Sequence, residues 1–156
     1  MADDADFMIK AIALACENAR LGRGGPFGAI VVHDDKVVGE GSNQVTGTND
    51  PTAHAEVVAL RAAGKKLDRF VLEGCVLYTS CEPCPMCLAA AYWARVDRIV
   101  FAATQDDAAA AGFDDAFLYE EIGKSHDARQ LPIKRLAIDA EDPFKIWLAN
   151  PNRIPY

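Results

Sequence analysis

Two spacings of hydrophobic residues alternate along the chain and predict its secondary structure. Phe7, Ala11, Leu14 and Ala15 recur at helical spacing up to the glycine-rich "GRGG", which predicts a first helix. The runs "FGAIVV" and "VVGEG" flank the turn "HDDK" and predict a β-hairpin. The remaining segments predict helices over residues 54–67, 84–95, 114–123 and 142–150, and strands over residues 75–80, 98–104 and 133–139.

Strands that alternate with helices after an opening hairpin are typical of an α/β domain with three layers, α/β/α, around a mixed sheet. A chain of 156 residues fits one such domain, residues 1–156. Two segments resist regular structure, the glycine-rich "LGRGGPFG" and the C-terminal "NPNRIPY". The second cannot continue a helix past its two prolines, so we expect residues 151–156 to form a tail.

The net charge of the chain argues against some classes of binding partner. Sixteen basic residues against 23 acidic ones leave a net charge of −7, which repels nucleic-acid phosphates and anionic lipid. We therefore expect neither nucleic acid nor a membrane as a partner. The N-terminus "MADDADFMIK" is acidic where a secretory signal is basic, so we expect a cytoplasmic protein. In that compartment, cysteines serve as buried thiols, metal ligands or catalytic groups rather than as disulfides.

Three of the five cysteines fall in "SCEPCPMC", residues 80–87. Cys84 and Cys87 are three residues apart, and a helix that begins near Pro83 or Cys84 places both on one face of its first turn. The helix dipole there favours the thiolate, which prepares the pair to bind a metal. Cys81 precedes this helix. Its spacing also permits ligation, but we expect a small buried side chain.

His54 is the candidate for a third ligand, at the start of its own helix in "PTAHAEV", and Glu56 follows two residues later. A catalytic zinc takes three protein ligands and leaves a fourth position open, whereas a structural zinc is closed by four. Three ligands from His54, Cys84 and Cys87 leave Glu56 beside the metal, where it can take a proton from an attacking water. The pattern therefore favours a catalytic zinc over a structural one.

The order of these motifs matches a known family. H-x-E followed by P-C-x-x-C is the signature of zinc-dependent nucleobase deaminases, and this chain has "HAE" at 54–56 and "PCPMC" at 83–87. The chain resembles the cytidine deaminase superfamily and, within it, the bacterial guanine deaminases, through "GGPFGAIVV", "NDPTAHAEV", "YTSCEPCPMCL", "YWAR" and "AGFDDAF". The resemblance implies a central mixed sheet of five strands, one Zn²⁺ per chain, a homodimer, and hydrolysis of guanine to xanthine and ammonia.

The resemblance also implies roles for individual residues. His54, Cys84 and Cys87 would bind zinc, and Glu56 would carry protons. The tail would fold over an active site, either its own or that of a partner after an exchange of C-terminal elements. Asp114 stays a rival to Asp115 as the carboxylate that contacts the base. The implied substrate contacts are Asn43, Asp115, Phe27, Trp93, Ala55 and Tyr156.

Three other functions fit parts of the same pattern. Guanosine or another aminopurine or aminotriazine is a candidate substrate on the same scaffold, because pocket shape decides between related rings. A tRNA adenosine deaminase shares the zinc motifs, but the negative charge and the lack of a basic C-terminal helix argue against it. A zinc-stabilised interaction module without catalysis is the third, and it leaves Glu56 unexplained.

Overall fold

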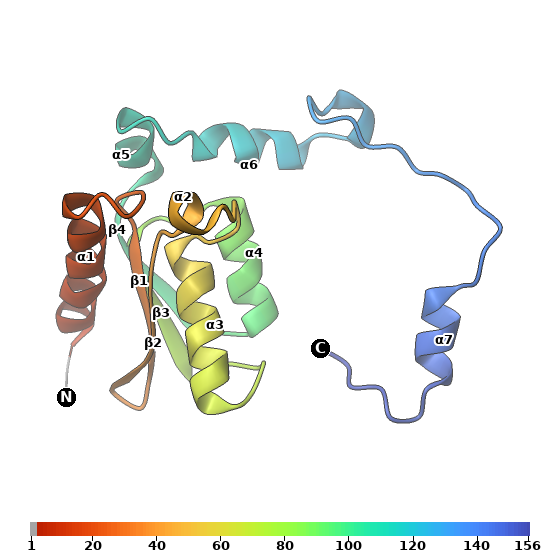
Figure 1. Ribbon diagram of the computed structural model, residues 1–156, viewed down its shortest axis with the longest axis horizontal. Coiled ribbons are helices and arrows are strands. Elements are labelled where there is room, and N and C mark those ends of the chain that lie inside the picture. Colours follow the sequence, from red (N-terminus) through yellow and green to blue (C-terminus); the bar gives the residue numbers. More distant parts are fainter. Residues whose placement is uncertain (1–2) are drawn as a thin grey trace.

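A sheet of four strands lies at the centre of the computed structural model, which describes residues 3–156 (Figure 1). The sheet order is β2-β1-β3-β4. Strand β1 pairs antiparallel with β2 and β3, whereas β3 and β4 are parallel. The mixed sheet expected from the sequence is therefore confirmed. The strands are β1 (Gly28–His33), β2 (Lys36–Ser42), β3 (Cys75–Cys81) and β4 (Arg98–Ala103).

Helices cover both faces of the sheet (Figure 1). On β1, Ala29 and Val31 point into the core beneath α3, while Ile30 and Val32 point into the core beneath α1. This alternation produces the three layers, with α1 on one face and α3 and α4 on the other. The helices are α1 (Asp4–Arg20), α2 (Val45–Thr48), α3 (Ala55–Leu67), α4 (Pro85–Ala94), α5 (Gln105–Ala110), α6 (Asp115–Gly123) and α7 (Pro143–Ala149), with a 3₁₀ turn at His126–Ala128. Within residues 3–156, none of these helices is both long and apolar enough to cross a membrane.

Helix α3 lies unusually close to the sheet at its first turn. A Cβ atom placed on Gly41 of β2 would lie 2.6 Å from the backbone nitrogen of Ala59 and would also meet the carbonyl oxygen of Ala55. Only glycine permits this approach, because any side chain would push the helix away. The contact fixes the start of α3, and with it the "HAE" motif, against the edge of the β-hairpin.

The fifth strand expected over residues 133–139 is not confirmed. This segment is extended, but it pairs with none of the strands in the described part of the chain, and Leu136 and Ile138 are 71% and 76% exposed. Figure 1 shows the chain leaving the three layers after α6, with α7 standing apart and the C-terminus turning back toward α4. The prediction of a strand at these residues was wrong for the single chain, because a strand needs a neighbouring strand with which to form hydrogen bonds.

Candidate active site

The three candidate zinc ligands converge where helices α3 and α4 begin. His54 and Cys84 are the N-cap residues of these helices, and Cys87 lies one turn into α4. The His54 Nδ1 atom is 3.6 Å from Cys84 Sγ and 3.5 Å from Cys87 Sγ. A tetrahedral zinc with ordinary bond lengths holds nitrogen and sulfur about 3.5 Å apart. The donor set and its spacing therefore fit a zinc ion with three protein ligands.

The sequence explains why Cys84 and Cys87 can share a metal. Pro85 occupies the first helical position of α4, where its fixed φ angle suits a helix start. In the metal-free chain, a hydrogen bond from the Cys87 thiol lowers the pKa of Cys84, while donation of that hydrogen bond raises the pKa of Cys87. The hydrogen bond with Cys84 likewise raises the pKa of His54. Metal binding replaces the protons that this cluster shares.

Glu56 lies beside the ligand cluster without belonging to it. Its side chain is only 6% exposed and lines the same cavity as His54 and Cys84. Burial raises the pKa of Glu56. A carboxyl group whose pKa is shifted toward neutrality suits proton transfer at ordinary pH, because it can both accept and return a proton.

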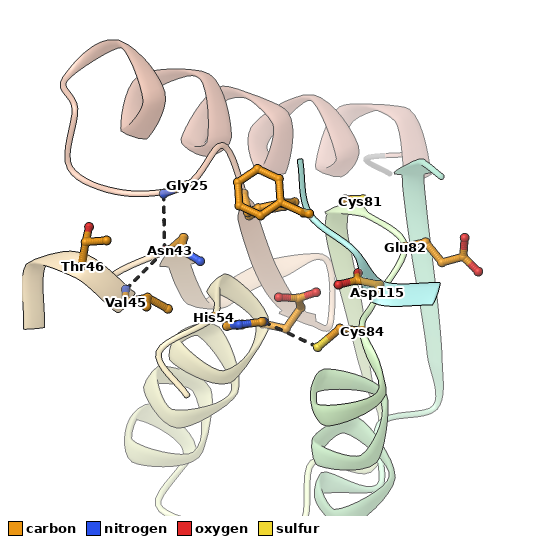
Figure 2. A pocket seen from close by; sticks show the side chains of 12 residues that line it. Gly25, Asn43, Val45, Thr46, His54, Cys81, Glu82, Cys84 and Asp115 are labelled. Atoms are coloured by element: carbon orange, nitrogen blue, oxygen red, sulfur yellow. Dashed lines mark hydrogen bonds between the residues drawn. The ribbon is translucent and has the colours of Figure 1, made fainter. Parts of the chain in front are cut away.

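A cavity of about 400 Å³ opens above the zinc ligands and is lined by residues from several elements (Figure 2). Phe27 and Phe113 meet edge to face across one side of it, with ring centroids 4.8 Å apart and planes at 82°. Apolar walls with a few directed polar groups are typical of a site for a flat heteroaromatic ring. The polar groups that line it include Glu56, Asn43 and Asp115.

The amide of Asn43 is oriented by the backbone around it. Its Oδ1 atom accepts hydrogen bonds from the backbone nitrogens of Gly25 at 3.4 Å and Val45 at 3.2 Å (Figure 2). Asn18, buried beneath the loop, donates to the backbone carbonyl of Asn43 at 2.9 Å. With its oxygen directed at the backbone, Asn43 presents its amide nitrogen to the cavity as a hydrogen-bond donor.

The two adjacent aspartates have different surroundings. Asp114 accepts a hydrogen bond from the backbone nitrogen of Phe117 at 3.0 Å and so caps helix α6. Asp115 lines the cavity, and partial burial raises its pKa. The geometry thus places Asp115, rather than its rival Asp114, where it can contact a bound ring.

Two residues expected at the site lie elsewhere in the same chain. Trp93 and Tyr156 are 65% and 73% exposed, and their rings contact each other with centroids 5.9 Å apart, outside the cavity that holds His54. Within a single chain, Trp93 and Tyr156 therefore do not lie where they could contact a substrate in this cavity. Ala55, also expected to contact the substrate, is fully buried between His54 and Glu56.

The cavity also contains residues that the sequence reasoning did not assign to it. Phe113 and Glu82 both line it, although each lies inside a motif that the resemblance used. Cys81 lines it too, but its Sγ atom contacts the carbonyl oxygen of Thr104 at 3.5 Å and takes no part in the ligand cluster. Burial raises the pKa of Cys81 to about 11, as suits a packed thiol.

Known proteins are similar to this chain in sequence and in fold. The chain is 50% identical over 151 residues to guanine deaminase of Bacillus subtilis, covering 96% of this chain and 97% of that protein. The X-ray structure of B. subtilis guanine deaminase superposes with a TM-score of 0.97 at 48% identity and 99% coverage of both chains. A protein crystallised with 8-azaguanine matches with a TM-score of 0.69 at 37% identity, covering 73% of this chain and 66% of that one.

Two further matches cover only part of the chain. The tRNA-specific adenosine deaminase of Buchnera aphidicola is 44% identical over only 82 residues, covering 53% of this chain and 54% of that protein. The family described as "Cytidine and deoxycytidylate deaminase zinc-binding region" matches residues 1–103, which include all three ligands. The chain therefore belongs to the cytidine and deoxycytidylate deaminase zinc-binding family.

Proposed function

We propose that this protein hydrolyses guanine to xanthine and ammonia at the zinc site. The observation that carries the proposal is the buried Glu56 beside a three-ligand cluster, because a purely structural zinc requires no such carboxylate. The extent of the similarity to B. subtilis guanine deaminase supports guanine as the substrate. The match to the tRNA deaminase covers only about half of the chain, which weakens that alternative.

His54, Cys84 and Cys87 would hold the zinc ion, which would supply Lewis-acid activation of a water nucleophile near neutral pH. Glu56 takes a proton from this water during attack on the ring carbon that bears the amino group. Glu56 passes this proton to the adjacent ring nitrogen, and then moves the remaining proton of the new hydroxyl group to the departing amine as the carbonyl forms. One water is consumed and one ammonia leaves, and a carbonyl group remains on the ring.

Guanine binding follows from the cavity walls. Phe27 lines the cavity and would supply an apolar wall for the flat ring, the role that the family resemblance implies for it. Asn43 donates from its amide nitrogen to an acceptor on the base, while Asp115 accepts from the ring N1–H and amino donors. The resemblance also implies a substrate contact from Ala55, which lies between His54 and Glu56 in the chain and is fully buried.

The protein acts as a homodimer in this proposal, with exchanged C-terminal elements. The segment after α6 exposes several apolar side chains, including Leu136, Ile138 and Phe144. Strand β4 lies at an edge of the sheet. A second copy can supply an edge for residues 133–139, which would make the fifth strand of the sheet. Trp93 and Tyr156, which contact each other away from their own cavity, would then close the cavity of the second copy.

Deleting residues 151–156 is expected to lower guanine turnover at least about tenfold, because the cavity loses a wall that excludes water. Coexpression with full-length Glu56→Gln chains distinguishes the two arrangements. If the tail covers the partner, purified mixed dimers regain about half of wild-type activity, since the truncated chain keeps Glu56 and borrows a tail and so completes one of the two sites. No recovery in purified mixed dimers would show that each tail serves its own site.

Ammonia release across guanine, guanosine, adenine, cytosine, cytidine and small aminotriazines tests the substrate. The proposal predicts strong turnover of guanine and little of the others, because each missing polar contact leaves a buried group unpaired. Turnover of guanosine without turnover of guanine would overturn the substrate and leave the mechanism in place.

A further inference from the structure

The substrate-facing residues Phe113 and Asp115 belong to a segment with little core of its own. Phe113 lies in the link between helices α5 and α6, and Asp115 begins α6; only Ala108 and Glu121 are buried in these two helices. Apolar packing therefore contributes little to holding Asp115 at a fixed distance from the zinc ligands. Something other than a hydrophobic core has to position this carboxylate.

Two sets of hydrogen bonds join this segment to the loop that precedes Cys84. The Glu82 carboxylate accepts from the backbone nitrogen of Gln105 at 3.1 Å and from its side-chain Nε2 at 3.2 Å. The Tyr119 hydroxyl donates to the backbone carbonyl oxygen of Pro83 at 2.8 Å. One set secures the start of α5 and the other secures α6, on either side of Asp115.

We propose that Glu82 and Tyr119 form a clamp, and that this clamp positions Asp115 and Phe113 for substrate binding. The clamp is defined by the bonds of Glu82 to Gln105 and of Tyr119 to Pro83. Glu82 and Pro83 immediately precede the zinc ligand Cys84. The clamp therefore fixes the position of the substrate contact Asp115 relative to the metal site.

Both residues act through others rather than on the substrate. Each oxygen of the Glu82 carboxylate already accepts a hydrogen bond, and Figure 2 shows this side chain directed away from His54 and Cys84. Tyr119 donates to the backbone of Pro83 and is not among the residues that line the cavity. Loosening the clamp should therefore weaken binding of the ground state and the transition state alike, which raises KM and spares kcat.

The smallest test is Tyr119→Phe, which removes one hydroxyl group and keeps the ring. We expect KM for guanine to rise about tenfold, with kcat within about twofold of wild type. Glu82→Ala should behave in the same way. Glu82→Gln should restore most of the loss, because the Gln105 amide can turn to accept from the new amide. The exposed Glu40 on β2 provides the matched control, and Glu40→Ala should leave KM unchanged.

A double-mutant cycle with Asp115 separates positioning from general loosening. In an Asp115→Ala background, Tyr119→Phe should raise KM much less than it does in wild type, because the polar contact that the clamp positions is gone and only Phe113 remains to be held. The same rise in KM in both backgrounds would overturn the proposal. A fall in kcat at unchanged KM would also overturn it, since that result would place the clamp in the chemical step.

The kinetic test uses guanine and therefore rests on the proposed function. A second measurement, hydrogen exchange, needs no substrate and tests the clamp by itself. Hydrogen exchange of zinc-loaded protein should show amides of residues 105–119 exchanging about tenfold faster in Glu82→Ala, with α3 unchanged. Absence of guanine turnover by wild type would defeat the proposed function alone. Unchanged exchange over residues 105–119 would defeat the clamp alone.

Discussion

Replacing Glu56 with glutamine is expected to lower the rate of guanine deamination by about 10³-fold, while zinc stays bound. Glutamine keeps the size and much of the hydrogen bonding of glutamate but cannot take a proton from water or return one to the leaving amine. Because Glu56 lies outside the ligand cluster, its replacement leaves all three donors in place. The loss should therefore appear in kcat rather than in metal content.

Steady-state ammonia release, with zinc quantified in the same sample, measures this effect. Glu40→Gln, on the exposed side of β2, removes the same charge far from the cavity and should behave as wild type. Retention of wild-type kcat by the Glu56 variant would contradict the assigned proton carrier. A wild-type protein that binds zinc and releases ammonia from no substrate would instead favour the interaction module.

Removing the metal has an equally large expected effect. Replacing Cys87 with serine should reduce bound zinc to a small fraction of wild type and abolish turnover, since a catalytic site with two remaining protein ligands holds zinc weakly. Chelation of wild-type protein should give the same loss, with recovery when zinc is returned.

The other cysteines supply the controls for that experiment. Cys81→Ser should retain zinc, because Cys81 contacts Thr104 and lies outside the cluster, and Cys16→Ser changes only an exposed thiol. Loss of zinc from the Cys81 variant equal to that from Cys87→Ser would show that the loop contributes a different ligand pair. Full activity of metal-free protein would contradict the zinc mechanism itself.

Local signals predicted the zinc site well because each ligand is fixed by the start of a helix. The proline after Cys84 and the position of His54 before α3 are readable from a single segment. The same holds for the hairpin and for the layered α/β arrangement, which follow from alternating apolar positions.

Features that depend on contacts between distant parts of the chain could not be predicted from short motifs. Residues 133–139 have the pattern of a strand, but pairing depends on an edge that the chain does not offer to them here. Trp93 and Tyr156 are aromatic, and aromaticity alone did not indicate that their rings contact each other outside the cavity. Phe113 and the Glu82 contact arise from the path of α5 and α6, which no short motif specifies.

Guanine incubated with zinc-loaded protein in ¹⁸O-labelled water tests the central claim most directly. A hydrolytic deaminase with a water nucleophile should release ammonia and xanthine in equal amounts, with one labelled oxygen in xanthine at the carbon that lost the amino group. Glu56→Gln should form both products about 10³-fold more slowly, and metal-free protein should form neither. Zinc-loaded wild-type protein that leaves guanine unchanged, or forms xanthine without the label, would contradict the account.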